Sequence, residues 1–202
     1  MSHVYFNGFL LTLGLIMAIG AQNAHVLRQG LRGEHVLLTV SVSALCDMLL
    51  IGVGIAGLGS LFVANPDLMA AARYGGAAFL LWYGARALRS AVRGGRAMDF
   101  AEHARMSRGQ ALLAAAGFSL LNPHAYLDTV VLLGSIGSQQ AEDLRPLFAA
   151  GAISASIVWF VLLGYGARLL VPLFAKPVAW RVLDALVALM LWGIAASAIF
   201  TP

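Results

Sequence analysis

The chain has 202 residues, of which 60% are hydrophobic and only 11% are charged. An ordinary soluble domain carries roughly 25% charged residues, so this composition excludes a water-soluble globule. The single cysteine, Cys46, excludes an intramolecular disulfide and a paired-thiol site. At about 20 apolar residues per membrane-spanning helix, the chain has room for six spans with short loops, and no separate soluble domain fits.

Apolar stretches bounded by polar clusters predict six membrane-spanning helices. In chain order they cover residues 5–27, 36–63, 68–91, 109–134, 147–171 and 178–200. The stretch before the first helix lacks the basic residues of a cleavable signal peptide, so this helix is expected to stay in the protein. We therefore expect one all-α membrane domain over 1–202, with halves at about 1–92 and 109–202 and a cytoplasmic linker at 93–108.

The basic residues predict how the chain is oriented. Of the 13 Lys and Arg residues, only Arg73 and Arg145 fall on the face that would also hold both termini. Because Lys and Arg near membrane-spanning ends are retained in the cytoplasm, the three loops on the other face are predicted to be cytoplasmic. Both termini are then external to the bacterial inner membrane. The formal net charge of +4 reflects this orientation and does not indicate nucleic-acid binding.

The third predicted helix continues beyond the lipid as a basic stripe. Its members recur at three- and four-residue spacing: Arg86, Arg89, Arg93 and Arg96. We interpret the stripe as an anchor that contacts anionic lipid head groups, with a regulatory or partner-binding surface as the alternative.

Two short segments 99 residues apart are similar. Residues 22–25 (QNAH) align with 121–124 (LNPH), Asn over Asn and His over His. Two halves of three helices enter the membrane in opposite senses, so the match predicts a 3+3 inverted repeat, an architecture of many secondary transporters. Gly20 and Pro123 weaken helices 1 and 4 at membrane depth, where freed backbone groups are tolerated only inside protein or beside an aqueous cavity. The two interrupted helices predict a binding site between the halves.

Two carboxylates lie inside predicted spans. Asp47 is in the middle of the second helix, where an ionised Asp costs about 3 kcal/mol, so a functional role is favoured over an aspartate held by neighbouring hydroxyls. Asp128, in the fourth helix, is one turn beyond His124, so the two side chains share a face. They predict either a proton relay or a His that only orients or neutralises Asp128.

Other polar side chains near the interruptions are candidate substrate ligands. Asn23 and Asn122, with Gln22 beside the first, could hold the carboxylate and amine of an amino acid, or could cap the loosened helix ends. Trp159, beside two serines, could stack on a cation, although core packing is the favoured interpretation. His25, at the cytoplasmic end of the first span, is interpreted as an interfacial residue.

The sequence predicts no cofactor and no metal. Residues 52–57 match the Gly-x-Gly-x-x-Gly dinucleotide pattern, but they lie inside a hydrophobic helix without a preceding strand. There is no Gly-Lys-Ser/Thr nucleotide loop and no HExxH motif, so ATP is not expected to supply energy within this chain.

Several runs resemble the LysE/ArgO branch of the bacterial lysine exporter superfamily, over nearly the whole chain. They are 20–24 (GAQNA), 26–30 (VLRQG), Cys46-Asp47, 76–84 (GAAFLLWYG), 122–129 (NPHAYLDT) and 151–156 (GAISAS). The run 122–129 is the most specific, since the sister branch for neutral amino acids typically has Pro-Gly-Pro-Asn where this chain has 20–23. His25 departs from the Phe expected there. The resemblance implies an exporter of arginine or lysine driven by the proton or electrical gradient, with Asp47 and Asp128 as its two intramembrane aspartates.

We therefore expect a secondary active exporter of L-arginine, with L-lysine as a further candidate, that exchanges its cargo for protons and is not an enzyme. On this hypothesis Asp47 contacts the guanidinium, and Asp128 with His124 handles the proton. One alternative is an exporter of another small solute, a neutral amino acid or a cation, and the lack of Cys or clustered His ligands disfavours a metal. The other is a non-transporting assembly factor, which leaves two interrupted helices and two buried acids unexplained. A homodimer is expected from the small size and glycine-rich helix faces.

Overall fold

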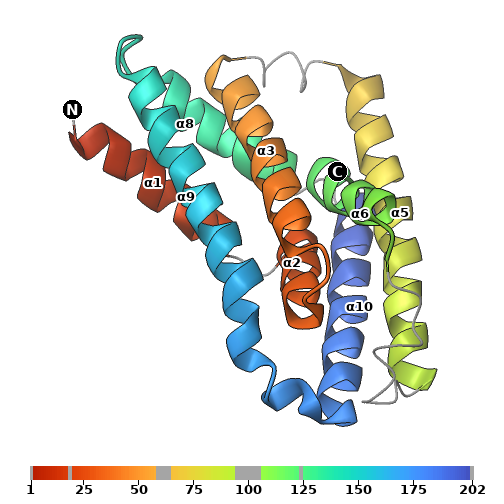
Figure 1. Ribbon diagram of the computed structural model, residues 1–202. Helices are drawn as coiled ribbons and strands as arrows, with labels where there is room; N and C mark the ends of the chain where they lie inside the picture. The colour runs from red at the N-terminus through yellow and green to blue at the C-terminus, as the bar shows by residue number, and fades with distance from the viewer. Residues whose placement is uncertain (1, 18–19, 58–64, 94–105, 123–124, 201–202) are drawn as a thin grey trace.

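The computed structural model describes residues 2–17, 20–57, 65–93, 106–122 and 125–200 (Figure 1). The regular elements in these ranges are all helices, which confirms the all-α class. They are α1 (Ser2–Ile16), α2 (Ala21–Arg32), α3 (Val36–Ile55), α5 (Pro66–Arg93), α6 (Arg108–Leu120), the π-helix η1 (Tyr126–Leu133), α8 (Gly134–Ser138), α9 (Arg145–Gly166), the 3-10 helices η2 (Ala167–Leu170) and η3 (Leu173–Ala175), and α10 (Pro177–Phe200).

Several of these helices have the length and composition to cross a membrane. Among the described residues they are α3, α9 with η2, and α10, whose mean hydropathies are 2.1 to 2.2. The pair α1 and α2 qualifies as a fourth span if it is taken together, and its two parts are bent by 81°. The helix α6, with 13 residues, is too short to qualify as a span. The helix α5 has 28 residues but does not qualify either. The protein is thus an integral membrane protein, and the count of six spans stays a prediction.

Two of the predicted helix ranges differ from the observed elements. The range 36–63 was too long, because α3 ends at Ile55 and Gly57 adopts a φ of 82°, a left-handed conformation that only glycine adopts readily. The range 109–134 is not one regular helix: α6 ends at Leu120, and the chain continues as η1 from Tyr126. A π-helix inserts extra residues into a turn and is common at functional sites.

The helices pack as a bundle around α3. Along its length α3 contacts α9 on one side and α6 and η1 on the other, α1 lies along α9, and α5 lies along α10 (Figure 1). In the order of the predicted repeat, α3 and α9 are the second helix of each half, and α5 and α10 the third. An inverted repeat predicts contacts between such counterparts, although the repeat itself stays a prediction. The consequence for the site is that α2, α3, α6 and α9 converge at the centre.

Glycines lie at the closest contacts between α1 and α9, a contact surface that we call the seam. A Cβ atom on Gly8 would lie 2.2 Å from the backbone oxygen of Phe148, and one on Gly151 would lie 2.0 Å from that of Tyr5. Small residues let membrane helices approach this closely. The backbones therefore touch, and neither can yield to a methyl group without a shift of the helix.

Replacing Gly8 by Ala is expected to destabilise the protein. Overpacking typically costs about 1 to 3 kcal/mol, which corresponds to several degrees in Tm for a chain of this size. Thermal unfolding in detergent micelles measures the effect. The matched control is Gly14→Ala in the same helix, where nothing lies within 4 Å of the added Cβ and the Tm should stay constant or rise. Equal Tm values for the two variants would contradict the close seam.

Candidate functional site

A cavity of about 240 Å³ opens where α1 gives way to α2. It is smaller than the roughly 300 to 1,000 Å³ of pockets for drug-sized ligands, so it suits a small solute. Its polar lining comes from α1, α2, α3 and the segment around η1, while apolar residues complete the wall. The lining residues used below are Thr12, Gly20, Gln22, Asn23, Asp47, Asn122, Asp128 and Thr129.

A side chain links α1 and α2 across the interruption of the first predicted helix. Gly20 precedes α2 with an extended backbone (φ −120°, ψ 174°) and makes no side-chain cap. Asn23 donates from Nδ2 to the carbonyl oxygen of Ile16, the last residue of α1, at 2.6 Å. Asn23 thus links the two half-helices and also lines the cavity, and its role as a substrate ligand stays a prediction.

Asp47 lies at the centre of the helix bundle. Its carboxylate is 5% exposed, and it accepts hydrogen bonds from Gln22 Nε2 at 3.2 Å and from Ser156 Oγ at 2.9 Å. Gln22 also donates to Ser119 Oγ at 2.9 Å. The Asp47 carboxylate thus connects α3 with α2 and α9, and the Gln22 amide connects α2 with α6. Hydrogen bonds to a charged acceptor offset part of the cost of burying it, so the network orients Asp47 at the cavity wall.

Asp128 faces the same cavity from the first turn of η1, next to Thr129. The structure therefore brings Asp47 and Asp128 to one cavity. Asn122 is buried beside them, and its backbone carbonyl oxygen accepts a hydrogen bond from the backbone amide of Ala125 at 3.0 Å. Pro123 and His124 lie outside the described residues, so the proposed contact between His124 and Asp128 stays a prediction.

Trp159 lies behind Asn23. Its Nε1 donates to Asn23 Oδ1 at 3.1 Å, and its ring packs against a buried apolar cluster that includes Val26, Val40 and Phe160. Trp159 is not among the lining residues of the cavity. In this structure it positions Asn23, and direct stacking on a substrate cation stays a prediction.

Four side chains of this site were not singled out from the sequence. Thr12, Ser119, Ser156 and Thr129 are small hydroxyl residues in apolar helices, and their types alone do not separate them from other hydroxyl residues of the chain. A spacing signal exists only for Ser156, which is one turn before Trp159 on α9.

His25 is buried, with 7% of its surface exposed, and its ring stacks on Phe118 at 4.8 Å between centroids. His25 is thus enclosed by protein where α2 packs against α6, and its interpretation as a residue at the membrane interface stays a prediction. His25 lines a second cavity of about 320 Å³ with Arg28, Arg32 and Arg86. Arg28 pairs there with the buried Asp184 of α10, at 3.1 Å.

Among the described residues, no three His, Cys, Asp or Glu side chains gather where they could hold a metal ion. The polar chemistry of the central cavity is therefore that of two carboxylates, amides and hydroxyls. Such groups bind cations and hydrogen-bond donors, and they can exchange protons.

The model of the family described as LysE type translocator matches residues 13–201. The chain is 47% identical over 189 residues to the candidate amino-acid transporter YggA of Aeromonas salmonicida, covering 93% of this chain and 91% of that one. It is 42% identical over 192 residues to the arginine exporter protein ArgO of Serratia proteamaculans, covering 95% and 94%. A candidate amino-acid transporter YggA of Aeromonas hydrophila is 48% identical over 170 residues, covering 84% and 75%. No solved structure matches.

Proposed function

Because the chain belongs to the LysE family of translocators, we propose that it is a secondary active exporter of L-arginine, with L-lysine as a further substrate. The proposed location is the bacterial inner membrane. Proteins of this family are transporters and not enzymes. The observation that carries the proposal is that Asp47 and Asp128 line one small cavity beside an interrupted helix.

The charges of the cavity suit a basic amino acid. L-Arginine carries two cationic groups and one carboxylate, and a guanidinium presents a planar fork that a carboxylate can meet with two hydrogen bonds. In the proposal Asp47 faces the side-chain cation, and Asp128 carries the proton that is exchanged for the cargo. A neutral amino acid would leave one of these acids without a partner in a site removed from water, which costs free energy. The named activity of the relative from Serratia proteamaculans supports the same choice.

Coupling to protons is part of the proposal. Burial disfavours the charged form of a carboxylate, and two nearby carboxylates disfavour each other's ionisation, so the empty cavity is expected to hold at least one proton. Arriving arginine stabilises the ionised carboxylates and releases that proton. A site that holds either proton or cargo, and alternates between the two faces, exchanges outgoing arginine for an incoming proton.

Citrulline, the neutral isostere of arginine, is expected to compete at least 100-fold more weakly than arginine. The difference follows from the loss of a charge-assisted contact worth about 3 kcal/mol. Counterflow of labelled arginine in liposomes that contain the purified protein measures it, with lysine and threonine as further competitors. Equal competition by citrulline, or preference for threonine, would favour an exporter of neutral amino acids. Absence of counterflow for every solute would favour an assembly factor.

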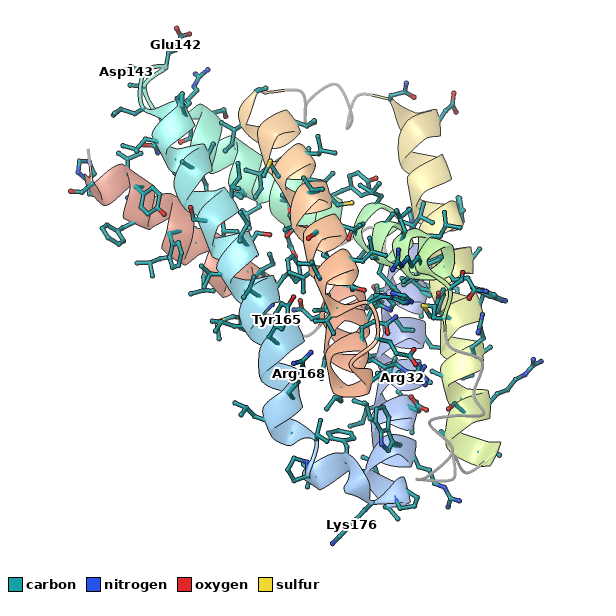
Figure 2. The ribbon with its side chains drawn as sticks, in the orientation of Figure 1. Arg32, Glu142, Asp143, Tyr165, Arg168 and Lys176 are labelled. Atoms are coloured by element: carbon teal, nitrogen blue, oxygen red, sulfur yellow. The ribbon has the colours of Figure 1, made fainter. Side chains whose placement is uncertain are left out.

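Both termini are expected outside the cytoplasm. Figure 2 shows Arg32, Arg168 and Lys176 towards one end of the molecule, and Glu142 and Asp143 at the other. Basic residues are retained on the cytoplasmic side, which gives the orientation. A periplasmically active reporter fused after Pro202 should be active, whereas the same reporter inserted at Lys176 should be silent. The opposite pattern would overturn the orientation.

A further inference from the structure

The first turn of α2 presents backbone donors to the cavity. The first intrahelical bond of α2 runs from the Ala24 amide to the Gly20 oxygen, so the amides of Ala21 and Gln22 precede the hydrogen-bonded ladder. Gly20 supplies no side-chain cap, and the first turn of α2 contains no acidic residue. Gly20 and Gln22 line the cavity. This helix end carries a partial positive charge, which favours an anion.

Thr12 adds an independent donor to the same cavity. Its side chain is 4% exposed, lines the cavity from α1, and its Oγ1 has no hydrogen-bond partner. Some helical hydroxyls of this protein bond to the carbonyl four residues earlier, as Ser119 does to Ala115 and Ser154 to Ala150. Thr12 does not, so its hydroxyl remains available to a ligand in the cavity.

The second interrupted helix is different at the corresponding place. The first turn of η1 contains Asp128, which supplies a negative charge at that helix end. The carboxylate of Asp47 is engaged by the side chains of Gln22 and Ser156. The cavity is therefore asymmetric. Asp47 and Asp128 supply acids, whereas the start of α2 supplies backbone hydrogen-bond donors and its first turn contains no acidic residue.

We propose that the backbone amide of Gln22, at the start of α2, and the hydroxyl of Thr12 form a subsite for the α-carboxylate of the cargo. The inference rests on the proposed function, since it assigns the cargo's anion once Asp47 has been assigned the guanidinium. It makes the protein selective for α-amino acids over amines of the same side chain. Agmatine, which is arginine without its carboxylate, should be a poor substrate although it keeps the guanidinium.

Competition in arginine counterflow tests the subsite. With the wild-type protein, agmatine is expected to compete at least 10-fold more weakly than arginine. Thr12→Val removes the hydroxyl and keeps the shape, and it should weaken arginine about 10-fold while agmatine changes little. The discrimination between the two ligands therefore narrows. Thr12→Ser, which keeps the hydroxyl, should restore most of it.

The matched control is Thr39→Val. Thr39 is also buried in an apolar helix with an unpartnered Oγ1, but it does not line the cavity, so its replacement should leave the discrimination unchanged. If agmatine and arginine compete equally in the wild type, the subsite is wrong while arginine export stands. If Thr39→Val narrows the discrimination as much as Thr12→Val, Thr12 has no such role. Failure of the wild type to carry arginine or lysine overturns the proposed function and the subsite with it. The wild-type comparison decides even if Thr12→Val fails to fold.

Discussion

Asp47→Asn is expected to abolish arginine binding, with a loss of affinity of at least 100-fold. The amide has nearly the same shape as the carboxylate but cannot supply the negative charge that faces the cation. Removing one partner of a buried charge pair typically costs about 3 to 5 kcal/mol, and each 1.4 kcal/mol corresponds to tenfold in affinity. Equilibrium binding of labelled arginine to the purified protein measures the loss directly.

The structure indicates how this variant can stay folded. Ser156 can rotate its hydroxyl to accept from the new amide, and the amide of Gln22 can turn to present its oxygen, so the network around position 47 can re-form. The control is Asp143→Asn, at an exposed aspartate far from the cavity, which should bind arginine as the wild type does (Figure 2). Near-normal arginine binding by Asp47→Asn would show that this aspartate does not read the cargo's charge.

The sequence was sufficient to select Asp47 because an acid within an apolar helix is costly, and that cost is local to the helix. Its partners could not be selected the same way. Gln22 is 25 residues away and Ser156 is 109 residues away, and their contact with Asp47 depends on how α2 and α9 pack on α3. A serine in an apolar helix carries no comparable penalty, so nothing in its local sequence marks it as a partner.

The geometry of the interrupted helices could likewise be predicted from the sequence only in part. Gly20 in an apolar stretch predicted a weak point in the first helix, and the described chain has α1 ending at Ile16 and α2 starting at Ala21. The 81° bend decides which residues of α2 are buried, and periodicity along one straight helix cannot give it. The stacking of His25 on Phe118 is one contact that the sequence pattern did not predict. The π-helical geometry of η1, which packs against α3, likewise has no signature in hydrophobic spacing.

Asp128→Asn is expected to separate proton coupling from transport. Arginine still has Asp47 and the donors around it, so exchange of internal for external arginine should continue within a few-fold of the wild-type rate. Net export driven by an imposed pH gradient should be lost, because the amide at position 128 cannot take up a proton in exchange for the cargo. Both activities are measured in the same liposomes, with and without the gradient.

The expected pattern depends on the two carboxylates having different tasks in one cavity. Asp47 is fixed by two side-chain donors on neighbouring helices, which suits a stationary cation contact. Asp128 lies in the first turn of η1, beside the interruption between helices α6 and η1. A change of backbone geometry there can alter the access of Asp128 to water on either face of the membrane. If Asp47→Asn keeps arginine exchange but loses gradient-driven export, while Asp128→Asn loses arginine binding, the tasks are reversed. If both variants lose thermal stability and all transport together, the two aspartates act as a structural pair, and the division between cargo and proton must be abandoned.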